Sequence, residues 1–265
     1  GVGEDLQRDN LGIGGNTLEV VAIVTGGGKG IGFGIATAFA KEGANLVITG
    51  RTIERLESAK QKLEAYGVTV LPVAADGGSE EQVKEAVRQT VEKFGKIDGL
   101  VNNAQVSKSG VLLKDHTKED FDLAVNSGLY AAFFYMRECY PYLKESKGSV
   151  INFASGAGLF GKPGQSSYAA AKEGIRGLSR VAATEWGPDG INVNVVCPLA
   201  WTSQLEQFQQ AYPEAFKANV HMPPMGHYGS PEYDIGRACV ALAGPDFKYM
   251  SGETLALEGG MGQRP

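Results

Sequence analysis

Cysteines and long apolar runs are scarce in this chain. Its 265 residues include three cysteines, Cys139, Cys197 and Cys239, which lie far apart and are odd in number. A disulfide framework is therefore not expected, and a reducing compartment such as the cytoplasm fits this composition best. No apolar run approaches the ~18 residues of a membrane span. The N-terminus is polar and rich in glycine, so a signal peptide is not expected either.

Excess positive charge and clustered metal ligands are also lacking. The formal net charge is −5 and the pI is near 5.4, whereas a nucleic-acid surface needs a basic stripe. The three histidines, His116, His221 and His227, form no metal-ligand pattern with the cysteines. We therefore expect neither a nucleic-acid partner nor a bound metal.

Short, nearly continuous apolar runs alternate with longer amphipathic stretches from Leu18 onward. Such runs are typical of strands buried on both faces, and their alternation with helices implies right-handed βαβ units. The sequence predicts an α/β fold with a Rossmann-type, doubly wound parallel sheet of about seven strands and helices on both faces. The expected strands are 20–25, 45–50, 68–74, 97–102, 148–154, 190–196 and 253–257. The expected helices are 30–42, 52–66, 79–94, 117–145, 166–186, 203–217 and 231–243, with Thr52, Ser79 and Thr117 as N-caps.

No shift in composition marks an internal domain boundary. We expect residues 1–17 to be a flexible extension and residues 18–265 to form one domain. Within it, residues 198–230 combine several prolines with aromatic residues, and long loops of this kind are often lids or binding segments. A surface excursion that packs its own aromatics is the alternative interpretation of this segment.

A glycine-rich turn, 25–32 (TGGGKGIG), follows the first expected strand and opens the first helix. Glycine allows the sharp turn and lets backbone N–H groups approach a pyrophosphate, and the helix N-terminus adds unpaired donors. This placement between strand and helix favours dinucleotide binding over a plain turn. The candidate cofactor-binding residues here are Gly26, Gly28, Lys29, Gly30, Ile31 and Gly32.

The second expected strand ends without an acidic residue. An acid there would hold the two free hydroxyls of an adenosine ribose, whereas this chain has Arg51. An arginine suits a 2′-phosphate through charge-assisted hydrogen bonds, and Lys29 adds a second positive charge nearby. The sequence therefore predicts NADP(H) as the cofactor rather than NAD(H). The alternative is that Arg51 is a solvated residue at the start of a helix.

Tyr168 and Lys172 stand four residues apart in the run SSYAAAKEG. In a helix both side chains lie on one face, and a nearby ammonium lowers the pKa of a phenol. A tyrosine tuned in this way exchanges a proton near neutral pH, as general acid–base catalysis requires. Alone, the pair is more typical of a packed ring and a solvated ammonium. Its catalytic interpretation depends on the cofactor motifs found elsewhere in the chain.

Taken together, these motifs resemble the short-chain dehydrogenase/reductase family in its single-domain form. The similarity extends from about Val20 to the C-terminus. It rests on TGGGKGIG, the run Asn102-Asn103-Ala104, Asn126, Ser155, and Tyr168 with Lys172. The resemblance implies a Rossmann-fold oxidoreductase, usually a homotetramer, that moves hydride between a nicotinamide and a carbonyl or alcohol.

The resemblance also implies a role for each matched residue. Tyr168 would be the acid/base, Ser155 would hydrogen-bond the reacting oxygen, and Lys172 would lower the pKa of Tyr168 and hold the nicotinamide ribose. Asn126 would support a water relay to the lysine, and Asp76 would contact the adenine. The remaining implied cofactor contacts are Asn103, Ala104, Pro198 and Thr202.

Two positions depart from the family pattern. Gln105 and Leu199 stand where the family has glycine. Both positions resemble the bacterial NADP-dependent 12α-hydroxysteroid dehydrogenases, and so do the segments 121–161, 166–206 and 246–265. Those enzymes interconvert a bile-acid hydroxyl and its ketone. This narrower resemblance implies a bulky hydrophobic alcohol or ketone as substrate. The candidate substrate residues are Gln105, Leu199, Trp201 and Phe208.

Two other functions remain open from the sequence. A reductase of small or acyl-carrier ketones would share the same motifs. An acyl-carrier enzyme would want a basic entrance, however, and residues 198–230 hold only Lys217 as a fixed cation. A non-catalytic NADP-binding sensor is the other alternative, and the intact Ser155, Tyr168 and Lys172 argue against it.

Overall fold

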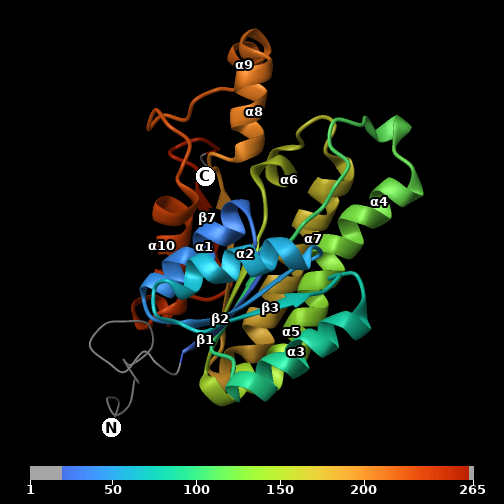
Figure 1. Ribbon diagram of the computed structural model, residues 1–265. Helices are drawn as coiled ribbons and strands as arrows, with labels where there is room; N and C mark the ends of the chain where they lie inside the picture. The colour runs from blue at the N-terminus through green and yellow to red at the C-terminus, as the bar shows by residue number, and fades with distance from the viewer. Residues whose placement is uncertain (1–19, 263–265) are drawn as a thin grey trace.

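Seven parallel strands form one central sheet in the computed structural model, which describes residues 20–262 (Figure 1). Their spatial order is β3-β2-β1-β4-β5-β6-β7. The predicted fold class and all seven predicted strands are confirmed, whereas the predicted extension 1–17 lies outside the described residues. The strands are β1 (Val21–Thr25), β2 (Asn45–Gly50), β3 (Val70–Ala74), β4 (Gly99–Asn102), β5 (Ser149–Phe153), β6 (Asn192–Pro198) and β7 (Thr254–Leu257).

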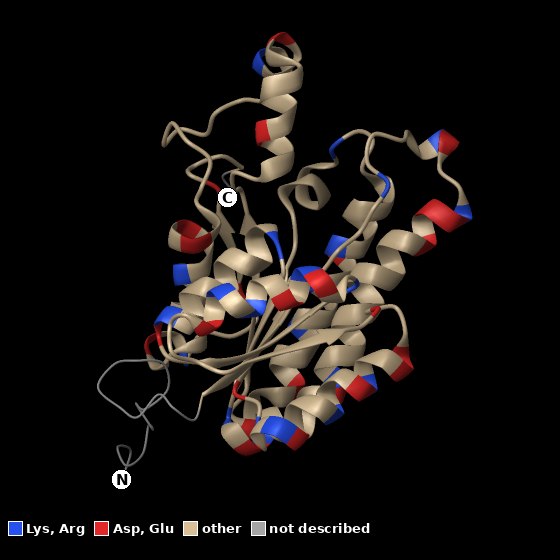
Figure 2. Ribbon diagram, in the orientation of Figure 1, with Lys and Arg blue, Asp and Glu red and all other residues tan. Residues whose placement is uncertain are grey.

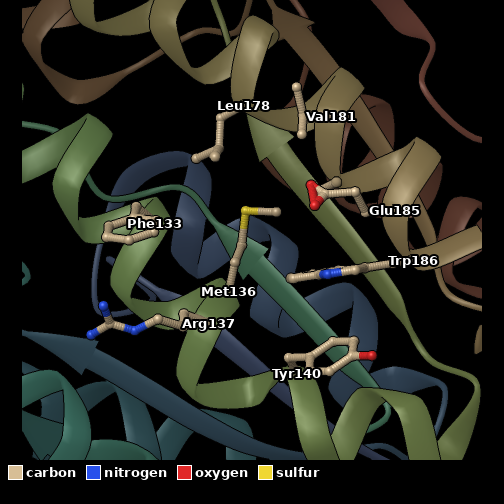
Figure 3. Close-up of a pocket in the computed structure, with 9 residues that line it drawn as sticks. Phe133, Met136, Arg137, Tyr140, Leu178, Val181, Glu185 and Trp186 are labelled. Atoms are coloured by element: carbon tan, nitrogen blue, oxygen red, sulfur yellow. The ribbon is translucent and has the colours of Figure 1, made fainter.

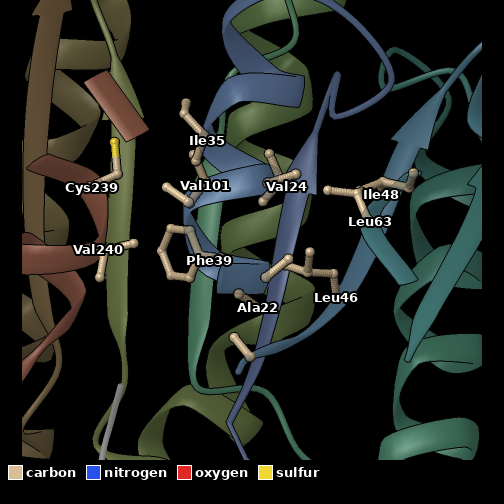
Figure 4. Close-up of a cluster of buried hydrophobic side chains, with 14 of the residues drawn as sticks. Ala22, Val24, Ile35, Phe39, Leu46, Ile48, Leu63, Val101, Cys239 and Val240 are labelled. Atoms are coloured by element: carbon tan, nitrogen blue, oxygen red, sulfur yellow. The ribbon is translucent and has the colours of Figure 1, made fainter. Parts of the chain in front are cut away.

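Helices cover both faces of the sheet, because each strand buries apolar side chains on both sides. On one face α1 (Gly30–Lys41), α2 (Ile53–Glu64) and α10 (Arg237–Ala243) enclose a core that includes Phe39 and Leu46 (Figure 4). On the other face α3 (Glu80–Phe94), α5 (Ala131–Ser146) and α7 (Ser166–Trp186) enclose a second core around Tyr135 and Leu100.

The strand order reverses between β1 and β4, which both leave the sheet at the same edge. In doubly wound sheets a ligand crevice opens at this point, outside the carboxyl ends of the strands. Figure 1 shows α4 (Lys118–Ala124), α6 (Gly156–Phe160), α8 (Ser203–Ala211) and α9 (Pro213–Asn219) beyond that edge. The fold therefore gathers the segments of the candidate site at one end of the molecule.

Three predicted helices differ from the structure in detail. The stretch 117–145 is not one helix, because the π-helix η3 (Val125–Tyr130) separates α4 from α5. The stretch 203–217 breaks at Pro213, whose ring removes a backbone donor, and becomes α8 and α9. The stretch 231–243 begins with a second π-helix, η5 (Pro231–Gly236), and the short helix α6 was not predicted.

All three predicted N-cap positions are confirmed, and two of the three residues make a side-chain capping bond. The Ser79 and Thr117 side chains accept hydrogen bonds from Gln82 N and Asp120 N at 3.3 and 3.1 Å. Thr52 occupies the N-cap position of α2 as predicted, although its side chain makes no capping hydrogen bond.

Candidate active site

The carboxyl ends of β1, β4, β5 and β6 carry most of the residues that the sequence analysis selected. The glycine-rich turn follows β1, the Asn103–Gln105 segment follows β4, and Ser155 lies two residues beyond β5. Tyr168 and Lys172 lie on the first turns of α7, and Pro198 ends β6. These segments share one edge of the sheet because all seven strands run parallel.

The turn after β1 is packed too tightly for side chains at two glycines. Gly26 has φ +66°, a left-handed conformation that glycine adopts without strain. A Cβ on Gly32 would overlap the carbonyl oxygen of Gly26, so the first turn of α1 lies directly on the loop. Lys29 takes the N-cap position of α1 without a capping side-chain bond. The N–H groups at the start of α1 are thus available to an anionic ligand.

Thr25 joins this turn to the segment after β4. Its Oγ1 accepts hydrogen bonds from the backbone N–H groups of Asn103 at 3.0 Å and Ala104 at 3.1 Å. The amide of Asn103 donates back to the Thr25 carbonyl at 3.3 Å. Sequence analysis did not select Thr25, although a hydroxyl at the end of the first strand of such a motif is a recognisable signal.

Three cations surround the region between the glycine-rich turn and the end of β2. Lys29 and Arg51 are exposed, and neither has a carboxylate partner within residues 20–262. Arg55, one turn after Arg51 on α2, brings its Cγ to 3.7 Å from the place a Cβ on Gly28 would occupy. Arg55 was not predicted; the signal that could have indicated it is a second arginine in the first turn of the helix that follows Arg51.

Asp76 follows β3 at the same edge of the sheet. Its Oδ1 accepts a hydrogen bond from Gly78 N at 2.9 Å, which holds the turn into α3. The carboxylate remains exposed, so the turn role and a ligand contact are compatible.

Ser155 and Tyr168 meet in front of β5. Ser155 is the N-cap of α6, and its Oγ accepts a hydrogen bond from Ala157 N at 3.1 Å. Burial raises the pKa of Tyr168, and a hydrogen bond from the Ser155 side chain lowers it in part. The phenol is therefore protonated at neutral pH, the form that can donate a proton to a ketone oxygen.

Lys172 is buried, with 3% of its surface exposed. Its Nζ donates a hydrogen bond to the carbonyl of Phe153 at 3.2 Å and lies 5.7 Å from the centre of the Tyr168 ring. Burial lowers the pKa of Lys172 to about 8. The prediction that Lys172 lowers the pKa of Tyr168 is thus wrong for this structure, because desolvation dominates both groups.

Asn126 lies in the π-helix η3, and its implied role in a water relay to Lys172 stays a prediction. The residue is exposed, and its Cβ lies 3.1 Å from where a Cβ on Gly78 would be. The next residue, Ser127, contacts Val106 in the segment after β4. Its Oγ accepts from Val106 N at 2.9 Å and lies 2.8 Å from the Val106 carbonyl. The π-helix itself was not predicted from the sequence.

Gln105 also differs from its predicted role. Its Nε2 donates to the carbonyls of Ala124 at 2.9 Å and Val106 at 3.1 Å and lies 3.3 Å from Ser127 Oγ. The amide Nε2 is therefore bound to backbone carbonyls, while Oε1 is buried without a hydrogen-bond partner in the described residues.

His116 attaches the loop after β4 to the start of α7. Its Nε2 lies 2.8 Å from the Oγ of the fully buried Ser167, and its Nδ1 lies 3.1 Å from the Val111 carbonyl. Because Ser167 precedes Tyr168, the histidine helps to fix the first turn of α7. Sequence analysis considered His116 only as a metal ligand and missed this contact.

The segment 198–230, here called the lid, is closed at its base by backbone pairing. Leu199 accepts a hydrogen bond from Gly229 N at 3.0 Å, and Trp201 N donates to the Gly229 carbonyl at 2.8 Å. At the far end, Met225 N donates to the Gly259 carbonyl at 3.0 Å, so the lid also rests on the chain that follows β7.

Aromatic rings hold α8 and α9 of the lid together. Trp201 packs edge-on against Phe216 and Tyr228 at 6.0 and 6.2 Å between ring centres, and Phe208 packs on Tyr212 and Phe216 at 6.1 and 6.0 Å. These contacts agree with the alternative expectation that residues 198–230 pack their own aromatic side chains. Charged residues on α8 and α9 are few (Figure 2): Glu206, Glu214 and Lys217.

Two predicted cofactor residues take part in the lid. Pro198 pairs with Leu257 at the end of β6, and Thr202 is the N-cap of α8 through Leu205 N at 3.2 Å. The Thr202 hydroxyl keeps its own proton as a donor for a further partner.

A cavity of about 250 Å³ lies on the outer face of α5 and α7, away from these residues (Figure 3). It contains none of the selected site residues. Within residues 20–262, no group of His, Cys, Asp and Glu side chains is arranged to hold a metal ion. No helix in that range is both long and apolar enough to cross a membrane.

The depressed pKa of Lys172 predicts a specific dependence of stability on pH. Between about pH 8 and 10.5 the unfolded chain binds more protons than the folded chain, so wild-type stability rises with pH in this window. A Lys172→Met variant lacks this contribution. We expect its stability relative to wild type to decline by about 3 kcal/mol from pH 7 to pH 10.5 in urea unfolding. A difference that is constant with pH would contradict the burial of a titrating ammonium.

Comparison with known sequences places the chain among reductases. The family model described as Enoyl-(Acyl carrier protein) reductase matches residues 26–262. A 12α-hydroxysteroid dehydrogenase from a Clostridium species is 68% identical over 252 residues, covering 92% of this chain and 97% of the relative. A 3-oxoacyl-[acyl-carrier-protein] reductase from Thermotoga maritima is 32% identical over 243 residues, covering 91% and 97%.

Solved structures agree with this placement. Levodione reductase superimposes with a TM-score of 0.86 at 32% identity, over 93% of this chain and 99% of its own. NAD⁺-bound xylitol dehydrogenase superimposes with a TM-score of 0.83 at 28% identity, over 92% and 100%. With the parallel seven-stranded sheet, the glycine-rich turn after β1 and the serine, tyrosine and lysine at its carboxyl edge, these matches show that the chain belongs to the short-chain dehydrogenase/reductase family of oxidoreductases.

Proposed function

We propose that this protein is an NADP(H)-dependent dehydrogenase that interconverts a secondary hydroxyl and a ketone on a hydroxysteroid, most specifically the 12α-hydroxyl of a bile acid. The observation that supports the substrate is the 68% identity, over nearly the whole of both chains, to a 12α-hydroxysteroid dehydrogenase. The mostly uncharged α8 and α9 of the lid agree with a bulky apolar substrate. The three cysteines are buried and form no disulfide among the described residues, which agrees with a reducing, cytoplasmic location.

The proposed mechanism assigns one task to each side chain in front of β5. A bound nicotinamide supplies the hydride-transfer chemistry. Tyr168 gives a proton to the substrate oxygen in reduction and removes it in oxidation, and Ser155 donates a hydrogen bond to the same oxygen. Lys172, buried one turn from Tyr168, holds the ribose.

The residues that would hold NADP(H) fit its phosphates. The glycine-rich turn exposes N–H groups at the start of α1, and Gly26 and Gly32 leave no Cβ in the way. Lys29, Arg51 and Arg55 offer positive charge without competing carboxylates in the described residues. A 2′-phosphate would neutralise these cations, which the hydroxyl of NAD(H) would not.

Removal of the Arg51 charge should weaken NADP selectively. In Arg51→Ala, we expect the KM for NADP to rise about tenfold or more, since one charge-assisted hydrogen bond contributes roughly 1.5–3 kcal/mol. The KM for NAD should change little, and Arg180→Ala, an exposed substitution on α7, should alter neither. Steady-state kinetics with both cofactors measure this. Equal losses with NAD and NADP would show that Arg51 does not read the 2′-phosphate.

The substrate and the acid/base are tested together. Wild-type protein with NADP should form NADPH on a bile acid that carries a 12α-hydroxyl and not on the analogue that lacks it. Tyr168→Phe should lose at least about a thousandfold in kcat while it still binds NADPH, because only the proton-transfer group is removed. Absorbance at the NADPH band and NADPH fluorescence report the two properties.

The outcomes separate the alternatives. Activity on small ketones without turnover of any steroid would replace the bile-acid proposal with a ketoreductase. Turnover of 3-oxoacyl carriers would do the same, although the lid holds a single fixed cation, Lys217, for an acidic carrier. Cofactor binding without hydride transfer to any substrate would indicate a sensor.

We also propose that two copies pair through α5 and α7, within a homotetramer. The cavity on this face is lined by exposed or half-buried apolar groups, including Phe133 and Val181 (Figure 3). Arg137, which also lines the cavity, is already paired with Glu80, so the apolar groups carry this proposal.

Val181→Glu should therefore disrupt assembly. The side chain is 56% exposed, so the change should be tolerated by the isolated subunit and should place a charge in a buried apolar interface of the assembly. We expect light scattering to show a smaller particle than wild type, whereas Tyr249→Glu, at a fully exposed residue, should keep the wild-type mass. An unchanged mass for Val181→Glu would remove this face from the interface.

A further inference from the structure

Gln105 occupies the space that a missing side chain leaves in the π-helix η3. A Cβ on Gly128 would overlap Gln105 Oε1, so the glutamine can lie here only because residue 128 is glycine. The match is visible only when both residues are considered. Gln105 by itself is a departure from the family pattern, and Gly128 by itself is a helical glycine, which lowers stability relative to alanine.

Hydrogen bonds hold the glutamine in this place. Its Nε2 donates to the carbonyl of Ala124 at 2.9 Å, the last residue of α4. Ser127 Oγ is shared among Gln105 Nε2, Val106 N and the Val106 carbonyl, and it also reaches the Leu123 carbonyl at 2.6 Å. The carbonyls of Leu123 and Ala124, where the α-helical pattern gives way to η3, are thus bonded by side chains.

The opposite side of η3 rests on the helix that carries the catalytic pair. A Cβ on Gly174 would lie 2.8 Å from Leu129 Cδ2, so Leu129 fits directly against α7. Gly174 is two residues beyond Lys172. The loop after β4, η3 and α7 therefore form one contiguous path of contacts from Gln105 to the buried lysine.

The other end of the same path is the candidate cofactor groove. Ala104, next to Gln105, is held by Thr25 Oγ1, and its Cα lies 3.3 Å from where a Cβ on Gly26 would be. The segment 103–106 is bonded to the glycine-rich turn on one side and to η3 on the other. Its position decides how the groove is aligned with Tyr168 and Lys172.

We propose that Gln105, Ser127 and Gly128 form a matched lock, in which Gln105 is a positioning residue that aligns the groove after β4 with the catalytic face of α7. Gln105 acts through the backbone of η3 and contacts neither substrate nor cofactor. The effect on the reaction rests on the proposed function, while the steric match between Gln105 and Gly128 does not.

The lock predicts a non-additive pair of substitutions. Gly128→Ala should reduce kcat about tenfold or more, because the new methyl expels the Gln105 side chain. In the Gln105→Gly background the same alanine no longer meets the Gln105 side chain and should cost less than about twofold. Gln105→Gly alone should lower kcat about tenfold, with the KM for substrate and the Kd for NADPH within about threefold of wild type, since the phosphate turn and the lid are intact.

Two further variants guard against a trivial loss of fold. Gln105→Glu keeps the shape but replaces a donor by an acceptor that faces carbonyls, so it should lower kcat at least as much as Gln105→Gly. Gln61→Glu, exposed on α2, makes the same change of charge and should leave kcat unchanged. Rates are expressed per NADPH-binding site, counted by fluorescence titration, so that unfolded protein does not contribute.

The results divide clearly. An equal effect of Gly128→Ala in both backgrounds, or an unchanged kcat for Gln105→Gly, would overturn the lock. If the wild type turned over no steroid, the bile-acid proposal would fail. The steric match would then be decided by the melting temperatures of the same four proteins, where Gly128→Ala should be destabilising only with Gln105 present. Additive melting shifts would overturn it as well.

Discussion

The burial of the Lys172 ammonium is the constraint on which the candidate site depends. A charged group removed from water is costly unless it finds hydrogen-bond partners, and here the Phe153 carbonyl at the end of β5 accepts one bond at 3.2 Å. That hydrogen bond fixes the position of α7 along β5. Ser155 lies two residues after Phe153, and Tyr168 lies one turn before Lys172. The same position of α7 along β5 therefore brings the serine and the phenol together.

Two further contacts hold α7 in this position along β5. His116 bonds the buried Ser167 beside Tyr168, and Leu129 of the π-helix packs on Gly174 beyond Lys172. Both contacts come from the stretch between β4 and β5, which also carries the groove segment 103–106. Burying Lys172 costs free energy and lowers its pKa, and the packed elements around α7 hold the lysine there nevertheless. Perturbed pKa values of this kind are common at catalytic sites.

Much of this arrangement could be predicted from the sequence, because it depends on local pattern. Apolar runs predicted all seven strands, and the glycine-rich turn, Ser155, Tyr168 and Lys172 were selected from their place relative to those strands. What could not be predicted depends on three-dimensional contacts. The π-helix η3 interrupts the predicted helix 117–145, and Ser127 on it bonds Val106 N; helical periodicity indicates neither feature. Gln105 bonds a helix carbonyl that lies 19 residues away in the chain. The pKa of Tyr168 is governed by burial, whereas the spacing suggested only the attraction to Lys172.

The central claim is that hydride passes between a steroid carbinol carbon and the cofactor at the edge where Tyr168, Ser155 and Lys172 meet. The most direct measurement uses a 12α-hydroxy bile acid with deuterium on the carbinol carbon, incubated with the full chain and NADP, followed by mass spectrometry of the products. The account predicts that the deuterium is found in the NADPH and that the bile acid leaves as the 12-ketone. Deuterium that stays on the steroid, or is lost to water, would contradict it.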